Sequence, residues 1–115
     1  MAKSEKVKEF SRIILNDGEG REYTLEFNRK TVEMMERNGF KLDTETPNTM
    51  ISELFQGAFR MNHKGMTPDR IREIWDAQRK KDDLLTALTK LYMKPLNDLM
   101  AEPEGEDDSP TWETA

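Results

Sequence analysis

Hydrophobic and polar residues alternate near the start of the chain. Residues 21–27 place an apolar side chain at every second position, with charged or polar side chains between them, which is the pattern of a half-buried strand. Residues 7–15 are rich in β-forming side chains, and the run Asn-Asp-Gly-Glu-Gly at 16–20 is a strong turn signal. We therefore predict a β-hairpin over residues 7–27. Because a lone hairpin is marginal in water, its apolar face must pack against a helix or another chain.

The next segment carries the start and stop signals of a short helix. Asn28 is a good N-cap because its side-chain oxygen can accept a free amide of the first turn. Gly39 suits the left-handed position just after a helix, and Met35 and Phe40 have the spacing of the apolar pair in a Schellman ending. These signals predict a helix over residues 29–38.

A cap residue followed by proline occurs twice further along the chain. Thr46 and Thr67 each precede a proline, which is well placed at the first helical position, where its missing N–H costs nothing. Apolar residues recur at helical spacing after each pair. We predict helices over 47–63 and 68–79.

A last helix is predicted over residues 83–100, with Asp82 or Asp83 as its cap. Leucines and a tyrosine form its apolar face. Pro95 falls within this face and should kink or end the helix, because it removes one hydrogen bond and crowds the preceding turn. The order of elements is α+β: an N-terminal β-hairpin followed by a bundle of three to four helices.

Charge separates the end of the chain from the rest. The net charge is −5, and residues 102–115 contain six acidic residues and no basic one, so residues 1–101 are almost neutral. A segment with so many charges, two prolines and a glycine has too little apolar surface to offset the entropy lost on ordering. We predict a single domain over 1–101 and a disordered acidic tail over 102–115.

Composition excludes several kinds of site. The chain has no cysteine, and its one histidine is His63, so thiolate metal sites, disulfides, cysteine nucleophiles and a histidine-rich metal site are excluded. His63 lies at the C-terminal end of a predicted helix, where a cation interacts favourably with the helix dipole. No phosphate-binding glycine loop is present. We expect no enzyme, no cofactor, no metal and no membrane segment.

An apolar helical surface is the remaining candidate for function. Eight methionines in 115 residues is a high count, and methionine suits surfaces that accept more than one partner shape. The residues that could bind a partner are Met50, Leu54, Phe55, Phe59, Met61, Trp75 and Tyr92, together with Trp112 in the tail. Each of the first seven could equally belong to the core. Trp112 could be a short linear anchor, since tryptophan is a frequent hot-spot residue, or a side chain without a contact.

The order of these segments resembles the small tail assembly chaperones of long-tailed bacteriophages. The segments that carry the resemblance are 23–28 (YTLEFN), 31–40 (TVEMMERNGF), 51–59 (ISELFQGAF) and 83–92 (DLLTALTKLY), with Trp112-Glu113 in the acidic tail. It covers about residues 20–100 and the tail.

The resemblance implies a non-enzymatic protein of phage or prophage tail assembly. Such chaperones bind the tape measure protein, keep it soluble and help recruit tail tube subunits. They act in the cytoplasm of the bacterial host and are generally not retained in the mature virion. The resemblance supplies no catalytic residues.

Two other functions remain open at this stage. One is a small phage structural subunit, a tail or head-completion protein, whose hairpin pairs with neighbouring copies to build a ring. The other is a DNA-binding regulator that uses the basic residues of the third helix, although acidic residues are interleaved with them and the net charge is negative. Self-association is a further expectation, because a body of this size leaves part of its apolar surface unburied.

Overall fold

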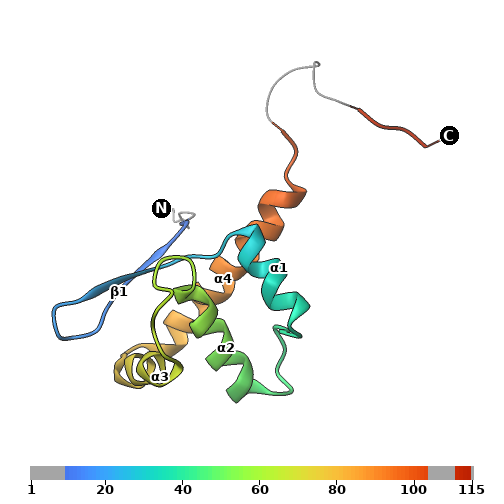
Figure 1. Cartoon of the computed structure of the whole chain (residues 1–115). Coiled ribbons are helices and arrows are strands. Elements are labelled where there is room, and N and C mark those ends of the chain that lie inside the picture. Colours follow the sequence, from blue (N-terminus) through green and yellow to red (C-terminus); the bar gives the residue numbers. More distant parts are fainter. Residues whose placement is uncertain (1–9, 104–110, 115) are drawn as a thin grey trace, which may run out of the picture.

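The computed structural model of the chain describes residues 10–103 and 111–114 (Figure 1). A two-stranded antiparallel hairpin is followed by four helices, so the α+β fold class predicted from the sequence is confirmed. Residues 101–103 and 111–114 form neither helix nor strand. The rest of the predicted acidic tail (104–110 and 115) and the predicted strand residues 7–9 lie outside the described residues.

The hairpin consists of β1 (Ile13–Asn16) and β2 (Glu22–Leu25), in a register that sets Leu15 opposite Tyr23. The alternating apolar residues Tyr23 and Leu25 of β2, and Phe27 just after it, are all buried, which confirms the predicted inward face. The first strand is shorter than predicted, because residues 10–12 are not paired.

Helix α1 (Arg29–Arg37) begins and ends as the sequence predicts. The side-chain oxygen of Asn28 accepts a hydrogen bond from the N–H of Thr31 at 2.8 Å. At the other end Gly39 has a φ of +94°, and the N–H of Phe40 donates to the carbonyl of Met35 at 3.0 Å. This is a Schellman ending with Met35 and Phe40 both buried.

Helices α2 (Pro47–Phe59) and α3 (Pro68–Ala77) both end earlier than predicted. After Phe59 the chain continues as a turn, in which the N–H of Arg60 donates to the carbonyl of Gly57 at 3.1 Å. The hydroxyl of Thr67 accepts a hydrogen bond from the N–H of Arg70, as expected of a cap. Thr46 occupies the matching position before α2, but its side chain makes no capping bond.

Helix α4 (Lys81–Met100) corrects the predicted cap. It begins after Lys80, which has a left-handed φ of 56°, so Asp82 and Asp83 lie in its first turn and neither is the cap. Carboxylates there still interact favourably with the positive end of the helix dipole. Of the two outcomes expected at Pro95, an end of the helix does not occur, and α4 continues to Met100, the last residue of the predicted range. Pro95 is buried in the core, so packing offsets the one hydrogen bond that its missing N–H removes.

One core joins the hairpin to the helices. Helix α2 packs against α3, α4 and β2, while α1 packs against α4. In Figure 1 the hairpin (blue) and the C-terminal end of α4 (orange) extend from this body in different directions. The hairpin turn contains a buried carboxylate, and the end of α4 carries exposed apolar side chains.

Candidate functional site

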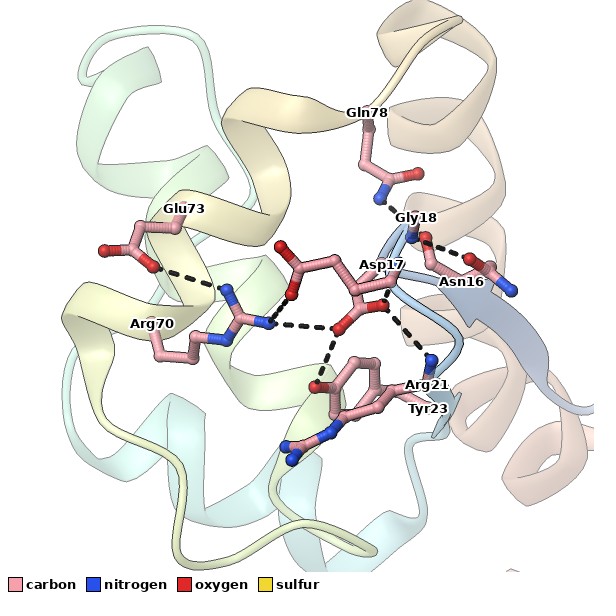
Figure 2. A network of polar contacts seen from close by, with 9 residues as sticks. Asn16, Asp17, Gly18, Arg21, Tyr23, Arg70, Glu73 and Gln78 are labelled. Atoms are coloured by element: carbon pink, nitrogen blue, oxygen red, sulfur yellow. Dashed lines mark hydrogen bonds and ion pairs between the residues drawn. The ribbon is translucent and has the colours of Figure 1, made fainter.

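The hairpin turn holds a buried carboxylate. The side chain of Asp17 is only 1% exposed. Its Oδ1 atom accepts the N–H groups of Glu19 at 2.8 Å and Arg21 at 3.2 Å, and its Oδ2 atom lies 3.5 Å from the hydroxyl of Tyr23 (Figure 2). These contacts, the Glu19 amide first, together with the charge of Arg70, hold the pKa of Asp17 below its ordinary value.

Arg70 of α3 ties this turn to the helices. Its Nη2 atom lies 3.0 Å from Oδ2 of Asp17, and Glu19 and Glu73 flank the same guanidinium at 3.7 and 3.3 Å. A second contact joins the turn to the end of α3, where the side-chain amide of Gln78 donates to the carbonyl of Asn16 at 3.1 Å (Figure 2). We call Asp17, Tyr23 and Arg70 the Asp17 network. Because the oxygens of Asp17 are committed to donors, the network fastens the hairpin to α3 and is not arranged as a catalytic acid or base.

The outer edge of β2 is also occupied. The N–H of Thr24 donates to Nε2 of His63 at 3.0 Å, and its carbonyl accepts from the side-chain amide of Asn62 at 3.1 Å. The N–H of Glu26 donates to the carbonyl of Ala58 at 3.1 Å. Because α2 ends at Phe59 and Nε2 of His63 accepts this strand amide, His63 does not occupy the helix end at which the sequence placed it. His63 instead closes a strand edge.

Half of the partner-binding residues suggested by the sequence are in the core. The buried four are Leu54, Phe55, Phe59 and Tyr92. The ring of Phe55 meets those of Phe59 and Trp75 at centroid distances of 5.0 Å each, and the ring of Tyr92 meets those of Phe27 and Phe40 at 5.2 Å. These edge-on aromatic contacts are core packing. The expectation that these four form a partner surface is therefore corrected, because a partner could reach them only by opening the core.

The other four suggested residues have some exposure. Met50, Met61 and Trp75 are partly buried, and Trp75 packs on Phe55. Trp112 is 85% exposed, the highest value among the large apolar side chains of the described residues.

A contiguous apolar surface lies instead at the C-terminal end of α4. Leu96, Leu99 and Met100 are 47, 50 and 72% exposed, and Met93 is partly exposed one turn earlier. These four residues share one side of the helix, and we call them the α4 stripe. In the sequence, Leu96 and Leu99 continue the apolar face of Leu88 and Leu91, but only the latter two are buried.

A groove of about 160 Å³ runs beside the α4 stripe, between α1 and α4. Its apolar lining comes from both helices, and charged residues of α1 stand at its rim; they are Arg29, Glu33 and Glu36. Tyr92 lies at its base, where burial and then the charge of Glu36 raise the pKa of the phenol. The arrangement suits an apolar side chain with a charge beside it.

Within the described ranges 10–103 and 111–114, no group of acidic or histidine side chains is placed to hold a metal ion. In the same residues, no helix is long and apolar enough to cross a membrane.

Comparison with known proteins identifies a family. The family described as Domain of unknown function (DUF5055) matches residues 1–115. No curated protein and no solved structure matches the chain. Since the match spans the whole sequence, the chain belongs to the DUF5055 family.

Proposed function

We propose that this protein is a phage tail assembly chaperone, which binds the tape measure protein, keeps it soluble and helps recruit tail tube subunits. It acts in the cytoplasm of the bacterial host and leaves the particle before the virion is complete. The proposal stands on the resemblance of the segments 23–40, 51–59 and 83–92 to such chaperones. One structural observation supports it: the large apolar side chain of Trp112 is free of the fold.

The exposure of Trp112 suits a contact with a client. A tryptophan that is 85% exposed adds almost nothing to the stability of its own chain. The same side chain, once seated in an apolar pocket, is among those that contribute most to binding between proteins. The residues before it are rich in acidic side chains, which keep a complex with an apolar client in solution.

A ring-forming structural subunit is less well supported. Hairpins that pair from copy to copy around a ring need two free strand edges. The outer edge of β2 already bonds Asn62, His63 and Ala58. Edge-to-edge pairing of hairpins would therefore have only β1 to use.

A DNA-binding regulator is also less well supported. Arg70 is engaged by Asp17, Glu19 and Glu73, and Arg72 lies 3.6 Å from Asp69. The ammonium group of Lys81 donates to backbone carbonyls at the end of α3. Cations that already have partners leave little positive field for a phosphate backbone.

Co-expression with the tape measure protein, the long coiled-coil protein encoded downstream, tests the proposal. We expect the tape measure protein to copurify with the wild-type chain and to be lost with Trp112→Ala, while the neighbouring change Thr111→Ala retains it. A tape measure protein that never copurifies with the wild-type chain would contradict the chaperone function. Equal copurification with Trp112→Ala would show that Trp112 is not required for binding the tape measure protein, and it would not contradict the chaperone function.

A further inference from the structure

We infer that a second copy of this chain covers the α4 stripe, through an antiparallel pair of α4 helices related by a two-fold axis at Leu96. This inference is separate from the chaperone function, because it uses neither Trp112 nor a client. The observation behind it is that large apolar side chains of the α4 stripe are exposed to water in a single copy. Leu96, Leu99 and Met100 are each about half exposed or more at the end of a helix that projects from the body (Figure 1).

The spacing of the stripe suits pairing with itself. Of its positions, 93, 96 and 99 read the same in both directions from Leu96. In an antiparallel pair centred there, Leu96 meets Leu96 and Leu99 meets Met93. The four positions of the stripe fall on one side of a helix with 3.6 residues per turn and span about 10 Å of its axis. The charged residues Lys94 and Asp98 fall on the opposite side and bond each other at 3.2 Å.

In this pairing, the groove beside the stripe lies opposite an apolar side chain of the second copy. Leu99 of the second copy, placed against Met93, reaches the groove lined by Val32, Tyr92 and Met93. By symmetry Leu99 of the first copy enters the same groove of the second. Each copy then fills the other's groove, which is the reciprocal contact that a two-fold interface requires.

The charges at the rim of the groove complement one another under the same symmetry. Arg29 stands at the C-terminal end of α4, where it lines a neighbouring hollow with Pro95 and Asp98. Glu36 stands near the other end of α1, where it lines the groove together with Tyr92. A two-fold axis at Leu96 exchanges these ends and brings Arg29 of one copy toward Glu36 of the other. The symmetry produces two such pairs of opposite charges, which favours this register. It also favours a second copy of the chain as the partner that covers the α4 stripe.

Cross-linking through single engineered cysteines tests the axis directly. The chain has no cysteine, so each introduced thiol is the only one present. A residue on the axis faces its own copy, and we expect Leu96→Cys to form a covalent dimer rapidly under mild oxidation. Ile14→Cys is the matched control, because Ile14 is an apolar residue of β1 with a similar exposure of 54%. Cross-linking of Leu96→Cys no faster than that of Ile14→Cys would overturn the inference.

Sedimentation of the full chain tests the contacts. We expect the wild-type chain to reach a dimer between micromolar and millimolar concentration, and Leu96→Glu to dissociate it at least about tenfold more easily, since an apolar contact is replaced by two facing charges. Ile14→Glu should leave the dimer unchanged. Arg29→Glu and Glu36→Arg should each weaken it, and combining them should restore it. A wild-type chain that stays monomeric throughout, or a dimer unaffected by Leu96→Glu, would contradict the proposed interface.

Discussion

At the scale of single residues, Asp17 is the group on which the hairpin–helix contact most depends. Its Oδ1 atom serves the turn and its Oδ2 atom faces Arg70. We expect Asp17→Asn to lower the urea midpoint of unfolding, because the amide keeps an acceptor for the turn but loses the charge opposite the guanidinium. Asp17→Ala should lower it further, since it also leaves the N–H groups of Glu19 and Arg21 without their acceptor.

Asp69 provides the matched control for these variants. It also pairs with an arginine, at 3.6 Å, but its side chain is almost fully exposed. Exposed ion pairs contribute little to stability, so Asp69→Asn should leave the urea midpoint nearly unchanged. Equal effects at Asp17 and Asp69 would contradict the role assigned to the Asp17 network.

The same carboxylate predicts how stability depends on pH. The folded pKa of Asp17 is lowered, mainly by the Glu19 N–H, so the folded state favours the charged form. Its contribution to stability is complete above the pKa of an unfolded aspartate, about 3.9, and is lost as the pH falls through the lower folded value. We expect the urea midpoint of the wild-type chain to fall more steeply below about pH 4 than that of Asp17→Asn. Parallel pH profiles of the two proteins would show that Asp17 is not responsible.

At the scale of elements, the two threonine–proline starts offer a comparison within one chain. Thr67 accepts a hydrogen bond from the N–H of Arg70 at 3.2 Å, whereas the side chain of Thr46 makes no such bond. We expect Thr67→Ala to cost about 1 kcal/mol of the free energy of unfolding, the usual value of a lost N-cap. Thr46→Ala should cost much less. Chemical denaturation of the two variants decides this, and equal losses would mean that the capping bond is not the cause.

Local sequence signals predicted the elements whose ends are determined locally. Asn28 and Gly39 bound α1 through contacts within a few residues, so their chemistry could be read from the sequence. The start of α4 could not, because it depends on Lys80 taking a left-handed conformation that lysine rarely adopts. The continuation of α4 through Pro95 depends on burial against the rest of the core, which local propensity does not contain.

At the scale of the whole molecule, the residues once suggested for partner binding separate into two groups with opposite predictions. Phe55 is buried among Phe59 and Trp75, and Phe55→Ala should cost about 3–5 kcal/mol, as expected for an aromatic side chain removed from a core. Trp112→Ala should leave the free energy of unfolding unchanged, because the indole is 85% exposed. Thermal unfolding of both variants tests the division, and a folded Phe55→Ala chain of full stability would contradict it.

The candidate surfaces could be predicted only in part from the sequence. Helical periodicity identified the apolar side chains, but it does not distinguish Phe59, inside the core, from Leu96, on a projecting helix end. The Asp17 network joins residues 53 positions apart, and no local pattern links Asp17 with Arg70. Which apolar face is covered depends on how the helices pack together, and this packing is a property of the whole fold.

The soluble fraction of the tape measure protein, expressed with and without this chain, is the measurement that tests the proposed function most directly. The proposed chaperone should keep the tape measure protein in solution, and the protein should precipitate when the chain is absent. The Phe55→Ala chain, destabilised in its core, should protect it less well than the wild-type chain. An equal soluble fraction with and without the chain would contradict the chaperone function, whatever the state of the α4 stripe.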